Sequence, residues 1–319
     1  IFNFRLDDEN LVTSDVTIAA SKYFSALDGY PVKTKDLAVP QTVAIMIDNH
    51  PDARHQSGLA KAKIVYEAPV EGGITRFMAI YNSNQDVSKV GPVRSARPYF
   101  LDWVQEYGNG LYMHSGGSPE ALDLIKKRKI FNANEFYWGN SYWRDGARTA
   151  PHNLYTKSHN WLEIISQKNV SSAFPFGNGW KYARLAGKPL AGAREGIKIS
   201  FDNNYVVSWK YDPARLDYVR YVNGEKHLDD GVEIRARNIL VQNVSAKVLD
   251  SEGRKEVGAI GKGEAKILKK GKIYLGTWEK KSVINRTRFF LQNKNETILL
   301  PGNTWVEVVT KDVNVLVTN

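Results

Sequence analysis

The pattern that most constrains the fold is a change in texture near the middle of the chain. Before residues 174–179, short apolar runs alternate with segments of helical spacing. After them, short strand-like runs follow one another, separated by turn-forming pairs such as Asn223-Gly224. Alternating strands and helices predict an α/β domain, whereas strands in hairpin succession predict an antiparallel β domain. We therefore predict two parts of different class.

The first part, predicted over residues 41–175, opens with the continuous apolar run 43–47. Such a run is typical of a strand buried on both faces, which predicts a mostly buried mixed sheet. Further strands are predicted at residues 64–67, 76–81, 89–93 and 111–114, and helices at 99–107, 118–129 and 158–167. The helix at 118–129 has the clearest boundaries, because a serine cap and a proline open it and lysines and an arginine close it.

The second part, predicted over residues 176–319, is β-rich and largely antiparallel. Its predicted strands are 197–201, 205–211, 216–222, 238–244, 265–268, 273–278, 288–291 and 304–309. The Asn-Gly pair between two of these runs is a strong hairpin indicator. Residues 1–40 are weakly patterned and are predicted to be a tether and lead-in segment. The whole chain is thus expected to be of the α+β / α/β class.

Composition narrows the function classes. The chain has 319 residues, no cysteine and a formal net charge of +10. The absence of cysteine excludes disulfides, thiolate catalysis and zinc–thiolate sites. Positive charge is scattered along the strands of the second half, without a basic block or a nucleic-acid motif, so we expect no nucleic-acid partner.

Polar residues follow several predicted strands, where ligands bind in open α/β sheets. The predicted ligand-binding residues are Asp48, His50, Glu71, Arg76, Arg94, Arg97, His114, Gly116, Gly117 and Ser118. We expect Asp48, His50, Arg94, Arg97, His114 and Ser118 to lie around one cleft. No catalytic residue is assigned.

The chemistry expected of this cleft is anion binding. The glycine pair before the helix at 118–129 is expected to offer free backbone N–H groups to an anion, and the arginines would hold a phosphate or carboxylate. The alternative is a set of internal salt bridges among the same arginines and the acids Asp48, Glu67 and Glu71. The histidines lack the spacing of a metal motif, so no metal site is predicted, and zinc would require them to converge in space.

A dense aromatic patch occupies residues 136–143, with tyrosine, tryptophan and phenylalanine among glycine and asparagine. Flat aromatic faces stack on sugar rings, which is one interpretation of the patch. Packing between the two parts of the chain is the other, and we favour it at this point.

Several long phrases of the chain are distinctive, namely residues 44–51 (AIMIDNHP), 70–77 (VEGGITRF), 90–98 (VGPVRSARP), 114–121 (HSGGSPEA) and 301–306 (PGNTWV). Together these phrases resemble YerB-like bacterial lipoproteins. The resemblance spans about residues 26–310. It implies a secreted protein tethered by a lipid on an N-terminal cysteine, which this sequence lacks; it starts at Ile1 without an initiator methionine, so we expect a trimmed chain. It implies no reaction and no catalytic residue.

The leading functional hypothesis is a lipid-anchored protein on the extracellular face of the bacterial cytoplasmic membrane. Its first domain would bind an anionic or sugar-containing envelope ligand, and its partners would be wall polymer or an envelope protein. No cofactor is expected. One alternative is an envelope phosphotransferase acting on a lipid-pyrophosphate-linked polymer, faintly resembling LytR-CpsA-Psr enzymes; Mg²⁺ would be its cofactor. The other alternative is a structural protein–protein interaction module.

Overall fold

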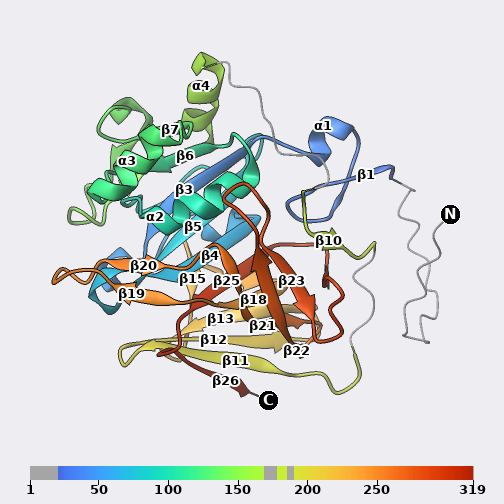
Figure 1. Cartoon of the computed structure of the whole chain (residues 1–319). Helices are drawn as coiled ribbons and strands as arrows, with labels where there is room; N and C mark the ends of the chain where they lie inside the picture. The colour runs from blue at the N-terminus through green and yellow to red at the C-terminus, as the bar shows by residue number, and fades with distance from the viewer. Residues whose placement is uncertain (1–20, 169–177, 185–189, 319) are drawn as a thin grey trace.

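The computed structural model describes residues 21–168, 178–184 and 190–318. Two β-sheets dominate it, a mixed sheet of ten strands and an antiparallel sheet of six (Figure 1). Short helices lie on the large sheet near one end of the molecule, and the six-stranded sheet lies below it in the same view. The predicted class, an α/β first part followed by a β-rich and largely antiparallel second part, is confirmed.

The ten-stranded sheet draws half its strands from each part of the chain. Its order is β23-β22-β21-β18-β25-β4-β5-β3-β6-β7. The strands of the first part are β3 (Thr42–Asp48), β4 (Ile64–Pro69), β5 (Thr75–Asn82), β6 (Leu111–His114) and β7 (Asn132–Asn134). Those of the second part are β18 (Asn238–Asn243), β21 (Gly261–Lys269), β22 (Lys272–Lys280), β23 (Arg288–Leu291) and β25 (Thr304–Val309).

The two parts meet within this sheet, where β4 pairs with β25 in parallel. The register sets Glu67 directly beside Glu307. Sequence patterning predicts both strands but contains no indication that they pair. The predicted boundary at 175/176 falls outside the described residues, and the shared sheet gives the two parts one continuous hydrogen-bonded framework.

The six-stranded sheet belongs wholly to the second part. Its strands are β11 (Gly196–Asp202), β12 (Tyr205–Asp212), β13 (Asp217–Val222), β14 (Glu225–Lys226), β17 (Arg235–Ala236) and β26 (Asn314–Thr318). All its pairings are antiparallel. The predicted hairpin at Asn223-Gly224 joins β13 to β14, with both residues at positive φ, 51° and 90°. Positive φ at both turn residues is what a two-residue type I′ loop requires.

Smaller elements complete the chain. Short paired strands are β1 (Tyr23–Phe24) with β2 (Pro31–Val32), β8 (Trp143–Arg144) with β9 (Leu154–Tyr155), β10 (Lys181–Tyr182) with β24 (Ile298–Leu299), β15 (Leu228–Asp229) with β16 (Val232–Glu233), and β19 (Ala246–Val248) with β20 (Lys255–Val257). The α-helices are α1 (Lys35–Ala38), α2 (Pro98–Val104), α3 (Pro119–Lys127) and α4 (Ser158–Lys168). Short 3₁₀ turns are η1 (Pro51–Ala53), η2 (Leu59–Lys61), η3 (Glu71–Gly73), η4 (Gln105–Tyr107) and η5 (Gly139–Ser141). Helix α3 begins as predicted, since Ser118 Oγ accepts the Ala121 N–H at 3.3 Å.

Both faces of the large sheet are covered, so β3 is buried at all seven of its positions. Its residues alternate between two hydrophobic clusters because successive side chains point to opposite faces of a strand. Met46 packs in the cluster that includes α2, through Trp103, and α3, through Ile125. Ile45 packs in the cluster that includes Trp209 of the six-stranded sheet. Packing on both faces fixes the position of β3, and with it the position of the residues that directly follow the strand.

The lead-in segment is folded against the rest of the chain in its described portion, residues 21–40. Residues 1–20 of the predicted tether lie outside the described residues. Leu27 is 1% exposed, and its carbonyl accepts a hydrogen bond from Tyr182 Oη at 2.8 Å. Asp28 lies 2.8 Å from Lys63 Nζ, and its carbonyl accepts the N–H of Gly302.

A buried ionic network ties the six-stranded sheet to the seam of the large one. Arg220 of β13, fully buried, donates from Nη2 to Glu67 Oε2 and to Tyr205 Oη. Its guanidinium also lies 4.9 Å from the ring centroid of Trp305. Burial and the neighbouring Glu67 carboxylate raise the pKa of Glu307 well above its usual value. The buried guanidinium of Arg220 and the buried carboxyl group of Glu67 compensate each other as a pair.

A second contact between the two parts involves a single buried acid. Asp229, 5% exposed, accepts the N–H of Ala60 at 2.8 Å through Oδ2, while Oδ1 has no partner among the described residues. Burial, together with the nearby carboxylate of Asp230, raises the pKa of Asp229 to about 6.

Replacing Arg220 with methionine should lower the free energy of unfolding by about 3–5 kcal/mol, because Glu67 would remain buried without its cation. Urea unfolding followed by circular dichroism measures this. Adding Glu67→Gln to Arg220→Met should restore part of the loss. The matched control is Lys226→Met, which removes a cation from the same sheet whose side chain is 52% exposed, and should leave the urea midpoint unchanged. A small loss in Arg220→Met would contradict a central role for the pair.

Asp229→Asn should make stability less dependent on pH. The pKa of Asp229 is about 6 in the native protein and 3.8 in the unfolded chain, so between these values the native protein holds a proton that the unfolded chain has lost. Native stability therefore falls as pH rises from about 4 through 6. The free energy of unfolding of the variant, relative to the native protein, should rise by on the order of 2 kcal/mol over that interval. A difference that stays constant with pH in parallel urea titrations would rule out this role for Asp229.

Candidate functional site

Asp48, the last residue of β3, is the hub of the predicted site. Its side chain is 1% exposed, Oδ1 accepts the N–H of His50 at 3.0 Å, and Oδ2 lies 2.7 Å from His152 Nδ1. Arg94 Nε lies 3.1 Å from the same Oδ2. The ring of His50 stacks on that of His152 at 4.5 Å between centroids. Asp48 thus gathers two side chains, those of Arg94 and His152, from two other segments, and binds the backbone of His50.

The charge state of Asp48 follows from these partners. Burial acts to raise its pKa, but the N–H of His50 and the nearby Arg76, His152 and Arg94 outweigh it and hold the pKa below the ordinary value. Arg76 lies opposite Asp48 in the pairing of β3 with β5. The carboxylate is therefore ionised at neutral pH, and it fixes the positions of the groups around it.

The other two predicted arginines, like Arg94, are engaged in internal ion pairs. Arg97 donates from Nε to Glu71 Oε2 at 2.9 Å, and its Nη2 bonds the other carboxylate oxygen. Arg76, 4% exposed, lies 3.9 Å from the same carboxylate and donates to the carbonyl of Ser95 at 2.9 Å. These contacts are the salt-bridge alternative foreseen from the sequence.

The glycine turn before α3 offers fewer donors than expected. The Gly116 N–H is bound by Asn134 Oδ1 at 2.9 Å, and the Ser118 N–H by the carbonyl of Ala96 at 3.3 Å. Within the described chain only the Gly117 N–H of the three has no hydrogen-bond partner. His114 is fully buried, and its Nδ1 lies 2.7 Å from the Gly116 carbonyl. Burial lowers the pKa of His114, which supports the turn as a neutral side chain.

The predicted residues do not gather around one cleft, which corrects that expectation. Arg94, Gly116 and Gly117 line one hollow of about 470 Å³, which we call the Arg94 hollow. Arg97 and Ser118 line another, of about 330 Å³, shared with residues 249–255 of the second part. The segment 94–97 runs extended beside the glycine turn, with Ala96 bridged to Gly117, so arginines three positions apart point to different hollows.

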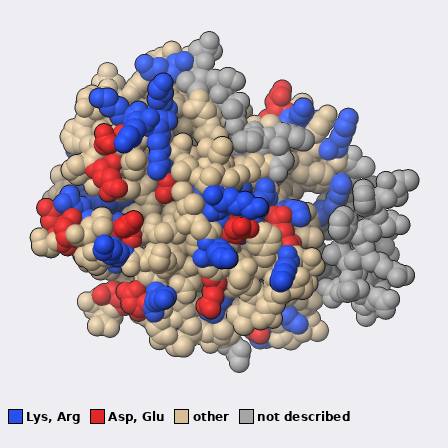
Figure 2. Space-filling model, viewed as in Figure 1, with Lys and Arg blue, Asp and Glu red and all other residues tan. Residues whose placement is uncertain are grey.

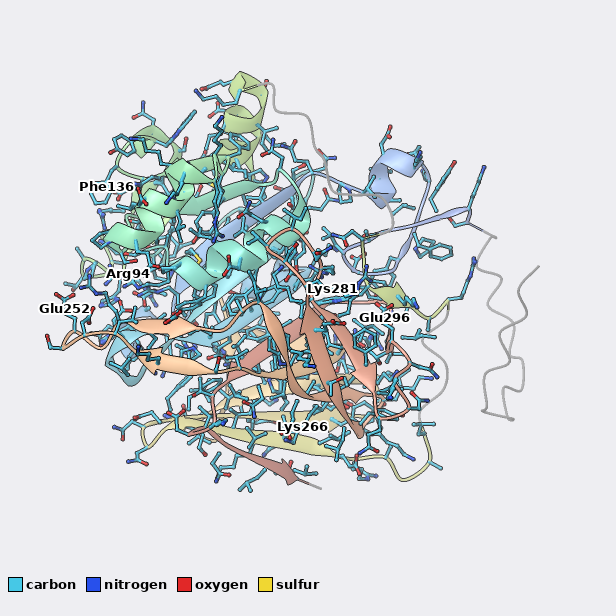
Figure 3. All side chains as sticks on the ribbon, viewed as in Figure 1. Arg94, Phe136, Glu252, Lys266, Lys281 and Glu296 are labelled. Atoms are coloured by element: carbon cyan, nitrogen blue, oxygen red, sulfur yellow. The ribbon has the colours of Figure 1, made fainter. Side chains whose placement is uncertain are left out.

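The Arg94 hollow also contains residues outside the predicted set. Arg144, Phe136 and Tyr137 line it. Phe136 is 73% exposed and Tyr137 86% exposed, so these two aromatic side chains do not pack between the two parts of the chain. Figure 3 shows Phe136 and Arg94 on the same side of the molecule, beside α3. The aromatic patch seen in the sequence indicated Phe136 and Tyr137. No spacing in the sequence indicated Arg144 in the hollow or His152 beside Asp48.

Phe136 is held against the glycine turn. Gly116 has a φ of +61°, and a Cβ built on it would lie 2.9 Å from the Phe136 ring. A glycine at this position thus permits both the turn and the close approach of the aromatic side chain. The ring and the turn form one wall of the hollow.

Comparison with known proteins places the whole chain in one family. The model described as "Protein of unknown function (DUF3048) N-terminal domain" matches residues 27–171, and its C-terminal counterpart matches residues 197–306. "Putative lipoprotein YerB" of Bacillus subtilis (strain 168) is 29% identical over 296 residues, which cover 91% of this chain and 87% of the relative. The chain belongs to the YerB-like family. The crystal structure of the YerB protein from Bacillus subtilis, 27% identical, matches with a TM-score of 0.81 over 92% of this chain and 100% of that chain.

The YerB-like relationship confirms the resemblance read from the sequence and supplies no activity. The matched domains are of unknown function, so any function of the site follows from its own residues. Among the described residues, no helix has the length and apolar character that a membrane crossing requires. On the face shown in Figure 2, basic and acidic side chains are mixed over most of the surface.

Asp48→Asn should lower the free energy of unfolding by about 1.5–3 kcal/mol, because the ion pair to Arg94 and the hydrogen bond to His152 lose their charged acceptor. Thermal and urea unfolding at pH 7 measure the change. Asp52→Asn, four positions away and 73% exposed, is the control and should leave stability unchanged. Equal effects of the two variants would contradict the role of Asp48 as the hub.

Proposed function

We propose that this YerB-like protein is a lipid-anchored envelope protein that binds an anionic, sugar-containing envelope ligand in the Arg94 hollow. The observation that carries the proposal is the pairing, in one hollow, of two largely exposed aromatic rings with two arginines. Neighbouring exposed aromatic side chains rimmed by polar residues are a common mark of a binding surface.

The aromatic wall suits the sugar part of the ligand. Phe136 and Tyr137 follow β7 directly and project from the turn between β7 and η5. Flat apolar faces pack against the C–H faces of a pyranose ring, while a phenolic hydroxyl keeps a polar end for its oxygens. Carboxamide and hydroxyl groups of Asn134 and Ser115, which also line the hollow, are suited to hydrogen bonding with sugar oxygens.

The cationic wall suits the anionic part. Arg94 contacts Asp48 through Nε alone, and its two terminal nitrogens have no partner among the described residues. Arg144 is 46% exposed and is partly offset by Glu135 at 3.1 Å. A guanidinium held in place by a buried carboxylate presents a planar pair of donors to a phosphate or carboxylate. The Gly117 N–H lies on the same wall and adds a further donor.

The location belongs to the same proposal. The relative is named as a lipoprotein, which supports a lipid anchor for this chain and a place on the extracellular face of the cytoplasmic membrane. Wall polymer or an envelope protein would be the partner there, and the membrane contact would be through the lipid alone. Nucleic acid is not part of the proposal.

The phosphotransferase alternative is less well supported by the geometry. It needs an acid and arginines open to a pyrophosphate and Mg²⁺, whereas Asp48 and Arg76 are 1% and 4% exposed. Arg97 is taken up by Glu71. A protein–protein module remains the other alternative, and it would use exposed surface outside the hollow.

Arg94→Gln should weaken binding of anionic muropeptides and teichoic-acid fragments about 10- to 100-fold, the equivalent of about 1.5–3 kcal/mol for a hydrogen bond to a charged group. Tyr137→Ala should weaken binding of both anionic and neutral glycan fragments. Isothermal titration calorimetry with purified fragments measures both, and thermal unfolding checks that each variant folds.

Matched controls are Arg215→Gln and Tyr30→Ala, which alter an arginine and a tyrosine at a separate hollow. Both should bind like the native chain. If the native protein binds none of the fragments, or if the controls weaken binding as much as the hollow variants do, the proposed function is wrong.

A further inference from the structure

His50, Asp52 and His152 form a second cluster beside Asp48. One nitrogen or oxygen from each of these side chains lies within 4.8 Å of the others. His50 and Asp52 follow β3 directly, whereas His152 lies in the loop before β9, so only the fold brings them together. We propose that these three side chains bind a divalent transition-metal ion, with zinc as the ion that they fit. This inference does not rest on the proposed function.

The set of donors is the one that zinc uses where it keeps an open position. Two imidazole nitrogens and one carboxylate oxygen form a three-ligand set, and water takes the fourth place. Ligand atoms in a tetrahedral zinc site lie about 3.3 Å apart, as follows from metal–ligand distances of about 2.0–2.1 Å. His50 Nδ1 is already 3.5 Å from Asp52 Oδ2. His50 Nδ1 also accepts the N–H of Asp52 at 3.3 Å, so it must give up this hydrogen bond to reach an ion.

Asp48 orients one of the ligands. Its Oδ2 lies 2.7 Å from His152 Nδ1, which places the proton on Nδ1 and leaves the lone pair of Nε2 for a metal. A carboxylate bound to the far nitrogen of a histidine is the usual support behind a zinc ligand, because it fixes the tautomer and makes the imidazole a better donor. Asp48 would thus be a positioning residue and His152 the ligand that it holds.

The second histidine has to turn. The rings of His50 and His152 are stacked with an angle of 13° between their planes. Lone pairs of nearly parallel rings do not point at one atom, so the stacked pair corresponds to the metal-free state. His50 is 40% exposed and Asp52 73% exposed, and rotation of these side chains is not blocked by burial. His152 is more enclosed, at 14% exposed, and stays in place.

The nearby cations temper the affinity. Arg94 is paired with Asp48, and Arg148 donates to the carbonyls of Ala53 and His55 at 2.9 Å. In the described part of the chain, neither arginine forms an ion pair with Asp52. Two arginines close to a site with a single ligating carboxylate weaken cation binding. We therefore expect binding in the micromolar rather than the nanomolar range.

The experiment titrates Zn²⁺ into the metal-free full chain at pH 7.5 by isothermal titration calorimetry. Co²⁺ absorption reports whether the bound ion has a four-coordinate environment. One ion per chain should bind. His152→Ala and His50→Ala should each weaken binding at least about tenfold, since each removes one of three protein ligands. Asp52→Asn should weaken it as well, and His50, being the more exposed histidine, gives a variant that should fold normally.

The matched control is His159→Ala. His159 lies 3.2 Å from Glu163 on α4, an exposed pair that could bind zinc weakly by itself. This variant should retain native binding. The proposal is overturned if the native chain shows no saturable binding of one ion, if His50→Ala and His152→Ala bind as the native chain does, or if His159→Ala is the variant that loses the ion. Glycan binding to the Arg94 hollow is measured separately without metal, so either proposal can fail alone.

Discussion

The ion pair between Arg220 and Glu67 is the interaction on which the arrangement of the two sheets depends. It joins β13 of the six-stranded sheet to β4 at the seam of the large one. Both side chains are fully buried, so neither can exchange its partner for water. Tyr205 and Thr75 both donate to the other oxygen of the same carboxylate, Oε1, at 2.6 and 2.5 Å. A hydrophobic contact tolerates sliding, whereas a buried network of this kind has one low-energy arrangement.

The seam explains why Glu307 differs from Glu67 although they are neighbours. Glu307 accepts a hydrogen bond from Trp209 Nε1 at 2.6 Å and has a raised pKa because it is buried, whereas Glu67 pairs with Arg220. Two ionised carboxylates at this spacing would repel each other in a medium of low dielectric constant. Asp48, by contrast, is ionised and surrounded by donors at the end of β3. There it pairs with Arg94, which lines the Arg94 hollow, and with His152 of the histidine pair.

Much of the fold could be predicted because many of its elements depend on residues close together in the sequence. The apolar run in β3, the capped start of α3 and the Asn-Gly turn after β13 each report their own conformation. The pairing of β4 with β25 has no local sign, since hydrogen bonds between strands leave no trace in either sequence. Arg220 lies in a predicted strand, and only the packing of that strand against the large sheet shows that its side chain is buried. Asp48 and His114 do end their strands, β3 and β6, as the pattern predicts, but the extended path of 94–97 separates Arg97 from Arg94.

The parallel pairing of β4 with β25 also bears on how the molecule is assembled. Residues 64–69 and 304–309 lie far apart in the chain, so the sheet stays incomplete until both segments are present. Until then β4 has a bare edge of unpaired N–H and C=O groups. Open edges of this kind invite pairing with other chains. The arrival of β25 closes that edge, so completion of the core depends on a contact between residues distant in sequence.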